Sequence, residues 1–170
     1  TLLSLVSAVA AAEESQLSQR FGLVHGEPSF CIELGTAWTR HDFTWAGIER
    51  TKGVFDFGGL PARVDAALEQ GVNFLPILDY APAWDPEVSP ADEETRDAWA
   101  RYVERTVSLF KGKLHYWQVW NEPNLAFWKP TPNARDYAEL LRRSYLAAKS
   151  VDPTVQVIGL NCSDIDLDFT

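Results

Sequence analysis

Residues 72–80 read VNFLPILDY, an apolar run that begins directly after Gly71. A short and nearly continuous apolar run between turn residues is typical of a strand buried on both faces, as in a parallel sheet covered by helices. Four other segments also have the character of strands. They are 21–24, 36–43, 114–120 and 155–160.

Helical patterns fill the intervals between these strands. Apolar residues recur every three or four positions within 60–68, 99–110 and 137–148, which predicts three amphipathic helices. The last four strands begin about 40 residues apart, so strand and helix alternate along the chain. Such alternation indicates a parallel sheet with right-handed helical crossovers.

Two α/β folds share this alternation. A doubly wound sheet that binds a nucleotide has a glycine-rich phosphate loop after its first strand, and 21–24 is followed only by His25-Gly26. A (β/α)8 barrel, or TIM barrel, carries its functional side chains at the C-terminal ends of its strands, where they also lie in this sequence. We therefore predict a (β/α)8 TIM barrel. Because a whole barrel needs about 250 residues, the 170 residues are expected to cover roughly its first five strands.

The composition narrows the classes of partner. Hydrophobic residues make up 46% of the chain and charged residues 23%, which suits one folded core and excludes disorder. The net charge of −9 argues against nucleic acid and against anionic membrane surfaces, whereas seven Trp residues suit flat, weakly charged ligands. Cys31, near the end of the first helix, and Cys162, after the fifth strand, are predicted to be free thiols at opposite ends of the barrel.

The first segment, residues 1–12, reads TLLSLVSAVAAA. It is too short to span a bilayer, but it is similar to the apolar region and cleavage site of a secretory signal. The alternative is an alanine-rich helix ahead of the first strand. A signal would make the protein secreted or periplasmic, and the alternative leaves a cytoplasmic location open. We assign residues 13–170 to the N-terminal half of the barrel.

The segment with the clearest chemistry is 116–130, YWQVWNEPNLAFWKP. Its strand brings Asn121 and Glu122 to the C-terminal end, and Pro123 stops it. Aromatic side chains exclude water from a neighbouring carboxylic acid and favour its protonated form, which a proton donor working near neutral pH needs. The alternative is a capping Glu in a loop of packing aromatics. The position at a strand end favours catalysis.

The tetrapeptide WNEP at 120–123 resembles the acid/base motif of the clan A glycoside hydrolases, which are (β/α)8 barrels. The longer run VWNEPNLAFWKP at 119–130 is most similar to family 39 and its relatives. The upstream run WTRHDFTWAGIERTKGVFDF at 38–57 resembles a segment after the second strand in several families of the clan. The resemblance implies a glycosidase that cleaves O-glycosidic bonds of oligo- or polysaccharides with retention, and that takes a carbohydrate substrate without a metal or cofactor.

The resemblance also implies roles for individual residues. Glu122 matches the general acid/base, and Asn121 matches the residue that contacts the sugar 2-hydroxyl. Arg40 matches an Arg that steadies the nucleophile, although a salt bridge with Asp42 or Asp79 is the alternative. The family's nucleophile is a Glu at the end of the seventh strand, which falls beyond residue 170. We therefore expect the 170-residue chain alone to be inactive.

Three more residues are expected at the substrate. His41 and Trp84 stand where such barrels commonly contact their ligand, and Trp128 offers a flat ring to a pyranose. Each has loop packing as its alternative. Two wider alternatives also stay open, namely a carbohydrate-binding pseudoenzyme that lacks the distal Glu and a non-enzymatic barrel in which the motif occurs by chance.

Other polar residues are not assigned a catalytic or metal-binding role. Glu49 is expected to hydrogen-bond a loop, and Gln118 stands where many relatives carry Glu. Asp164, Asp166 and Asp168 alternate after the last strand and are interpreted as a solvated loop, because no His or Cys accompanies them as a metal ligand.

Overall fold

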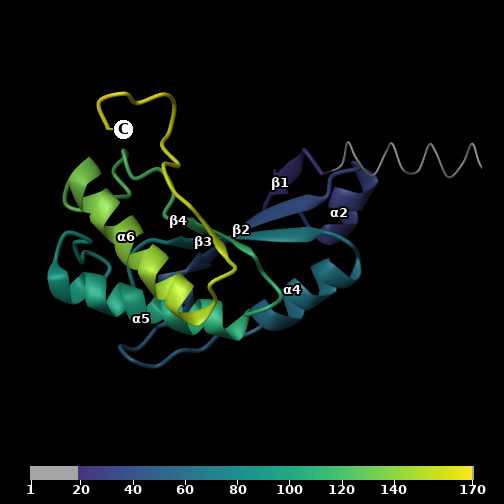
Figure 1. Ribbon diagram of the computed structural model, residues 1–170, viewed down its shortest axis with the longest axis horizontal. Coiled ribbons are helices and arrows are strands. Elements are labelled where there is room, and N and C mark those ends of the chain that lie inside the picture. Colours follow the sequence, from purple (N-terminus) through teal and green to yellow (C-terminus); the bar gives the residue numbers. More distant parts are fainter. Residues whose placement is uncertain (1–18, 170) are drawn as a thin grey trace, which may run out of the picture. The chain divides into compact units, whose positions relative to one another are not determined.

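The computed structural model describes residues 19–169 (Figure 1). The predicted signal segment, residues 1–12, lies outside the described residues. The chain divides into two compact units. The first comprises the described residues up to His41 together with Gly59–Leu75, and the second comprises Asp42–Gly58 together with the described residues from Pro76 onward.

Within the described residues, five strands form one sheet in the sequential order β1-β2-β3-β4-β5. They are β1 (Gly22–Val24), β2 (Trp38–Thr44), β3 (Asn73–Asp79), β4 (Tyr116–Val119) and β5 (Gln156–Ile158). The pairs β1–β2, β3–β4 and β4–β5 run parallel. A doubly wound sheet would place later strands on both sides of its first strand, so the sequential order confirms the prediction of a barrel topology.

The helices alternate with the strands as predicted. They are α2 (Pro28–Glu33), α3 (Trp45–Ile48), α4 (Leu60–Glu69), α5 (Glu93–Leu109) and α6 (Ala134–Val151). The two long helices begin at side-chain caps, since Asp92 accepts from the Thr95 N–H and Asn133 accepts from the Asp136 N–H, each at 3.1 Å. In the part of the chain that the structure describes, no helix is long and apolar enough to cross a membrane.

In the second unit, α5 and α6 pack side by side (Figure 1). A buried hydrogen bond of 2.7 Å from Trp99 Nε1 to Ser144 Oγ joins them. At their exposed edge, Arg143 of α6 forms ion pairs with Glu93 and Asp97 of α5. Both helices contact the end of β4, because Trp99 of α5 meets the ring of Trp120 at 5.7 Å and Tyr137 of α6 donates to the Val119 carbonyl at 3.1 Å.

Aromatic residues fill the core beside α5. Trp45 stacks on Tyr102 with ring centroids 5.7 Å apart and meets Trp99 edge-on at 5.5 Å. Glu49 is buried beneath them, where it accepts from Trp45 Nε1 at 2.5 Å and from the Gly53 N–H at 2.6 Å. The predicted structural role of Glu49 is therefore confirmed.

Candidate active site

The ends of β3 and β4 carry unusual backbone conformations. Tyr80 has φ of 62°, Trp120 of 63° and Glu122 of 50°. Residues other than glycine rarely adopt this left-handed region, which costs on the order of 1–3 kcal/mol each. Such strain persists only where the surroundings hold it, and it gathers at functional sites. The strained positions in this unit include the residue that the sequence selects as the acid/base.

Hydrogen bonds fix this strained segment. The Trp120 N–H donates to the Leu78 carbonyl at 2.7 Å, and the Trp120 carbonyl accepts from Gln118 Nε2 at 2.8 Å. Asn161, which follows β5, donates from Nδ2 to the same carbonyl at 3.1 Å, while its main-chain carbonyl accepts from the Glu122 N–H at 3.0 Å. Neighbouring strands on both sides therefore hold the end of β4.

Tyr80 brings the end of β3 to the predicted catalytic residues. Its phenolic oxygen accepts a hydrogen bond of 3.1 Å from Asn121 Nδ2. Burial raises the pKa of Tyr80 above its usual value, the Asn121 bond opposes this rise, and the charges of Asp79, Asp42 and Glu122 add to it. The phenol therefore stays protonated at neutral pH.

An open groove of about 370 Å³ runs along these strand ends. Its lining includes Tyr80, Val88, Trp120, Phe127 and Lys129. Phe127 is 50% exposed, and its ring centroid lies 5.5 Å from that of Tyr80. Exposed aromatic faces with few charges suit the C–H faces of a sugar ring.

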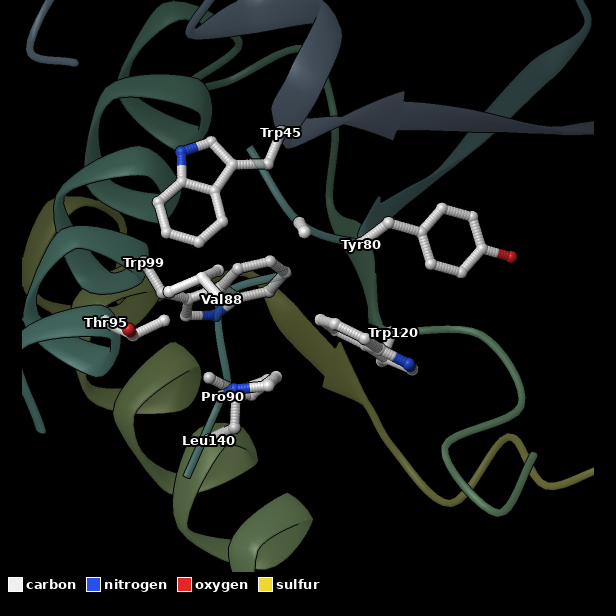
Figure 2. Close-up of a pocket in the computed structure, with 9 residues that line it drawn as sticks. Trp45, Tyr80, Val88, Pro90, Thr95, Trp99, Trp120 and Leu140 are labelled. Carbon is white, nitrogen blue, oxygen red and sulfur yellow. The ribbon is translucent and has the colours of Figure 1, made fainter. Parts of the chain in front are cut away.

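Behind the groove lies a tightly packed aromatic pocket (Figure 2). Trp45, Trp99 and Trp120 face one another there, and the space left for the centre of a water molecule is only about 10 Å³. That volume holds one water at most, so this pocket is core packing. In Figure 2 the hydroxyl of Tyr80 and the indole nitrogen of Trp120 point away from Trp45 and Trp99.

Trp128 belongs to the loop after β4 and is buried among aromatic side chains. It is 1% exposed, and its ring meets Trp120 at 5.0 Å and Tyr137 at 5.9 Å, both edge-on. A ring with 1% exposure offers no face to a ligand. The structure therefore fits the packing role that the sequence left open for Trp128 and does not support stacking on a sugar.

Trp84 lies in a different place from the groove. It meets Trp45 edge-on at 5.7 Å, and Lys52 Nζ lies 4.9 Å above its ring. With Lys52, Asp92 and Glu94 it lines a polar hollow of about 130 Å³. The groove along Tyr80 and Trp120 does not include Trp84, so its role as a substrate contact stays a prediction.

Arg40 and His41 belong to the first unit, unlike the four other predicted site residues. Arg40 is paired with Val24 across β1 and β2, and its carbonyl accepts from the His25 N–H at 2.8 Å. This pairing fixes the backbone of Arg40. Its role beside a nucleophile stays a prediction.

His41 is enclosed within the first unit. It is 4% exposed and stacks on Phe74 with ring centroids 5.1 Å apart. Its Nε2 lies 3.3 Å from the Gly26 carbonyl oxygen and 3.4 Å from Arg63 Nη2. Burial lowers the pKa of His41, and the Arg63 charge contributes in the same direction, while the Gly26 bond opposes both. This environment fits the packing role that the sequence left open.

The acidic loop after β5 is hydrogen-bonded to the loop after β4. Asp166 accepts from Asn124 Nδ2 at 3.0 Å and from the Phe169 N–H at 3.1 Å. Among the described residues, no three His, Cys, Asp or Glu side chains come together to hold a metal ion. Cys31 and Cys162 are both free thiols, as predicted.

Sequence patterns did not indicate Tyr80 or Asn161 as site residues. Tyr80 follows the buried strand β3 directly, and the rule that active sites of barrels lie at strand ends could have selected it. Asn161 follows β5 in the same way. Its contacts join segments about 40 residues apart, which no local pattern reveals.

No protein-family model matches this chain. The endo-1,4-beta-xylanase B of Neocallimastix patriciarum is 31% identical over 87 residues, which are 48% of this chain and 10% of the relative. The beta-xylosidase of Geobacillus stearothermophilus is 34% identical over 84 residues, which are 45% of this chain and 16% of the relative.

Solved structures match more of the chain. A family 39 glycoside hydrolase from the gut symbiont Bacteroides cellulosilyticus WH2 is 25% identical with a TM-score of 0.69, and the match covers 82% of this chain and 31% of that one. The chain spans less than a third of the length of each of these three proteins. The sequential parallel strands and this match together show that the chain is related to glycoside hydrolases and has part of the (β/α)8 barrel of clan A.

Proposed function

We propose that the protein carrying this sequence hydrolyses O-glycosidic bonds of oligo- or polysaccharides with retention, with Glu122 as its general acid/base. One observation carries the proposal. Asn121 and Glu122 follow β4 at its C-terminal end, in a strained and hydrogen-bonded segment next to an aromatic groove. In barrel enzymes the active site lies at that end of the strands.

The chemistry needs one proton donor and one nucleophile. Glu122 would first protonate the glycosidic oxygen and then, as a carboxylate, deprotonate the water that releases the sugar. In a retaining enzyme the second carboxyl group lies roughly 5–5.5 Å away. We propose that this nucleophile comes from a strand beyond residue 170 and that the 170 residues alone have no turnover.

The groove favours an uncharged sugar. Tyr80, Trp120 and Phe127 line it with apolar ring surface, and Lys129 adds one charge. The curated relatives are a xylanase and a xylosidase, so aryl β-xylosides and β-1,4-linked xylooligosaccharides are the first substrates to test. Glucosides and galactosides complete the panel.

The test uses the complete protein and follows the anomer of the first product by NMR. Retention of configuration, and loss of activity in Glu122→Gln, would support the proposal. Glu104→Gln, at an exposed position of α5, is the matched control and is expected to remain active. Inversion, or no cleavage of any glycoside by the folded wild type, would refute it. Binding of xylooligosaccharides without cleavage would favour the carbohydrate-binding alternative.

A further inference from the structure

We propose that Asn161 is a positioning residue for Glu122, which it keeps in place by holding the backbone from Val119 to Glu122. The proposal rests on the function proposed above for Glu122. Nothing in the resemblance or in the sequence patterns assigned a role to Asn161. Asn161 lies three residues beyond the end of β5, the strand that neighbours β4 in the sheet.

Asn161 forms hydrogen bonds with three backbone groups of the segment from Val119 to Glu122. Its Nδ2 donates to the Val119 carbonyl at 2.9 Å and to the Trp120 carbonyl at 3.1 Å. Its main-chain carbonyl accepts from the Glu122 N–H at 3.0 Å. A primary amide carries two N–H donors, so the side chain can satisfy both carbonyls together.

The segment needs such support because its backbone leaves the regular strand. β4 ends at Val119, and Trp120 and Glu122 both have left-handed φ values. Peptide groups turned in this way lose the regular ladder of the sheet and need other partners. Asn161 supplies them from the neighbouring strand end, so the direction in which Glu122 leaves the backbone depends on this residue.

Tyr137 also links the end of β4 to the segment after β5. Tyr137 of α6 donates from its hydroxyl to the Val119 carbonyl at 3.1 Å and accepts from the Leu160 N–H at 2.9 Å. Because Tyr137 also supports Val119, loss of the Asn161 side chain is expected to loosen the end of β4 without unfolding the unit. The loosening should be largest at Trp120 and Glu122.

The chain offers a matched control in Asn124. Its side chain also joins the loop after β4 to the segment after β5, with Nδ2 donating to the Ser163 carbonyl at 3.0 Å and Oδ1 accepting from the Ser163 N–H at 2.9 Å. These bonds do not involve the backbone from Val119 to Glu122. Comparing Asn161→Ala with Asn124→Ala therefore separates positioning of Glu122 from general support of the loops.

The experiment measures kcat/KM of the complete protein on aryl xylosides with good and poor leaving groups. A poor leaving group needs protonation and a good one does not, so misplacement of Glu122 harms only the former. We expect Asn161→Ala to lose about tenfold or more on the poor leaving group and about twofold or less on the good one. Asn124→Ala is expected to affect both equally. Equal losses in Asn161→Ala, or no loss, would overturn the proposal.

A second readout works even if the wild type cleaves no xyloside. Amide hydrogen exchange at Glu122 reports whether its backbone is held, and it does not depend on catalysis. The main-chain carbonyl that accepts from the Glu122 N–H remains in Asn161→Ala, so a rise in exchange at Glu122 reports the loss of the side-chain bonds to Val119 and Trp120. We expect this exchange to become about tenfold faster or more in Asn161→Ala and to stay unchanged in Asn124→Ala. Unchanged exchange in Asn161→Ala would refute the holding role, whereas an inactive wild type with faster exchange in Asn161→Ala would refute only the enzymatic function.

Discussion

The side-chain amide of Asn121 donates a hydrogen bond of 3.1 Å to the phenolic oxygen of Tyr80. This bond joins the C-terminal ends of β4 and β3, and it connects the predicted sugar contact to the wall of the aromatic groove. Since burial raises the pKa of Tyr80, its hydroxyl stays protonated over the neutral range and remains a partner for Asn121.

Removing this hydroxyl should impair recognition of the sugar 2-hydroxyl. In Tyr80→Phe the amide of Asn121 loses this hydrogen bond, and a hydrogen bond of this kind is worth about 1 kcal/mol. We expect kcat/KM of the complete protein to fall by about three- to tenfold on an aryl glycoside and to change little on the 2-deoxy analogue. Equal losses on the two substrates would show that Tyr80 does not contribute to recognition of the 2-hydroxyl.

Trp128 and Phe127 are neighbours with opposite exposure, 1% and 50%. Trp128→Ala should lower the free energy of unfolding by about 3–5 kcal/mol, because it empties a buried site between aromatic rings. Phe127→Ala should change stability little and raise KM instead. Urea unfolding and steady-state kinetics measure the two effects. A Trp128→Phe variant that is as stable as the wild type but has a raised KM would instead support stacking of Trp128 on the sugar.

Tyr137 should make stability fall at high pH. Burial raises the pKa of Tyr137 to about 12. The folded state therefore holds this proton more tightly than the unfolded state, whose pKa is near 10, so stability is fully present below pH 10 and is lost as the pH rises to 12. The difference of two pKa units corresponds to about 3 kcal/mol.

Urea unfolding of the wild type and of Tyr137→Phe from pH 8 to pH 12 tests this. The wild type should be more stable at pH 8, and its advantage should shrink by about 3 kcal/mol towards pH 12. Tyr145→Phe, at an exposed position of the same helix, controls for the loss of a hydroxyl. If the wild type were more stable than Tyr137→Phe by the same amount at every pH, the raised pKa of Tyr137 would be contradicted.

The strands and long helices could be predicted from the sequence because each has a local signal. The apolar run before Tyr80 marks a buried strand, and the spacing of apolar residues marks α5 and α6. The helix α3 at Trp45–Ile48 has only four residues, which is too short for a helical period to show. The position of Glu49 before the Lys52-Gly53 turn predicts a hydrogen bond to a loop, and its carboxylate accepts from the Gly53 N–H.

The site was harder to predict because it depends on contacts between distant segments. The motif identifies Asn121 and Glu122, but the left-handed backbone at Trp120 and its support from Asn161 arise only when β4 and β5 meet. Aromatic residues in a loop have no period that separates buried from exposed positions. The sequence therefore leaves both a sugar contact and loop packing open for Trp128, and only the structure shows that it is buried.

The most direct measurement of the proton-donor role of Glu122 compares the wild type with Glu122→Ala in the complete protein, with and without azide. We expect kcat/KM to fall by about 10²- to 10⁴-fold for a xyloside with a poor leaving group and much less for a dinitrophenyl xyloside. Azide should restore turnover of the dinitrophenyl xyloside by attacking the glycosyl-enzyme, and should give a xylosyl azide of retained configuration. Equal losses on both xylosides, with no azide product, would contradict the assignment of Glu122 as the acid/base.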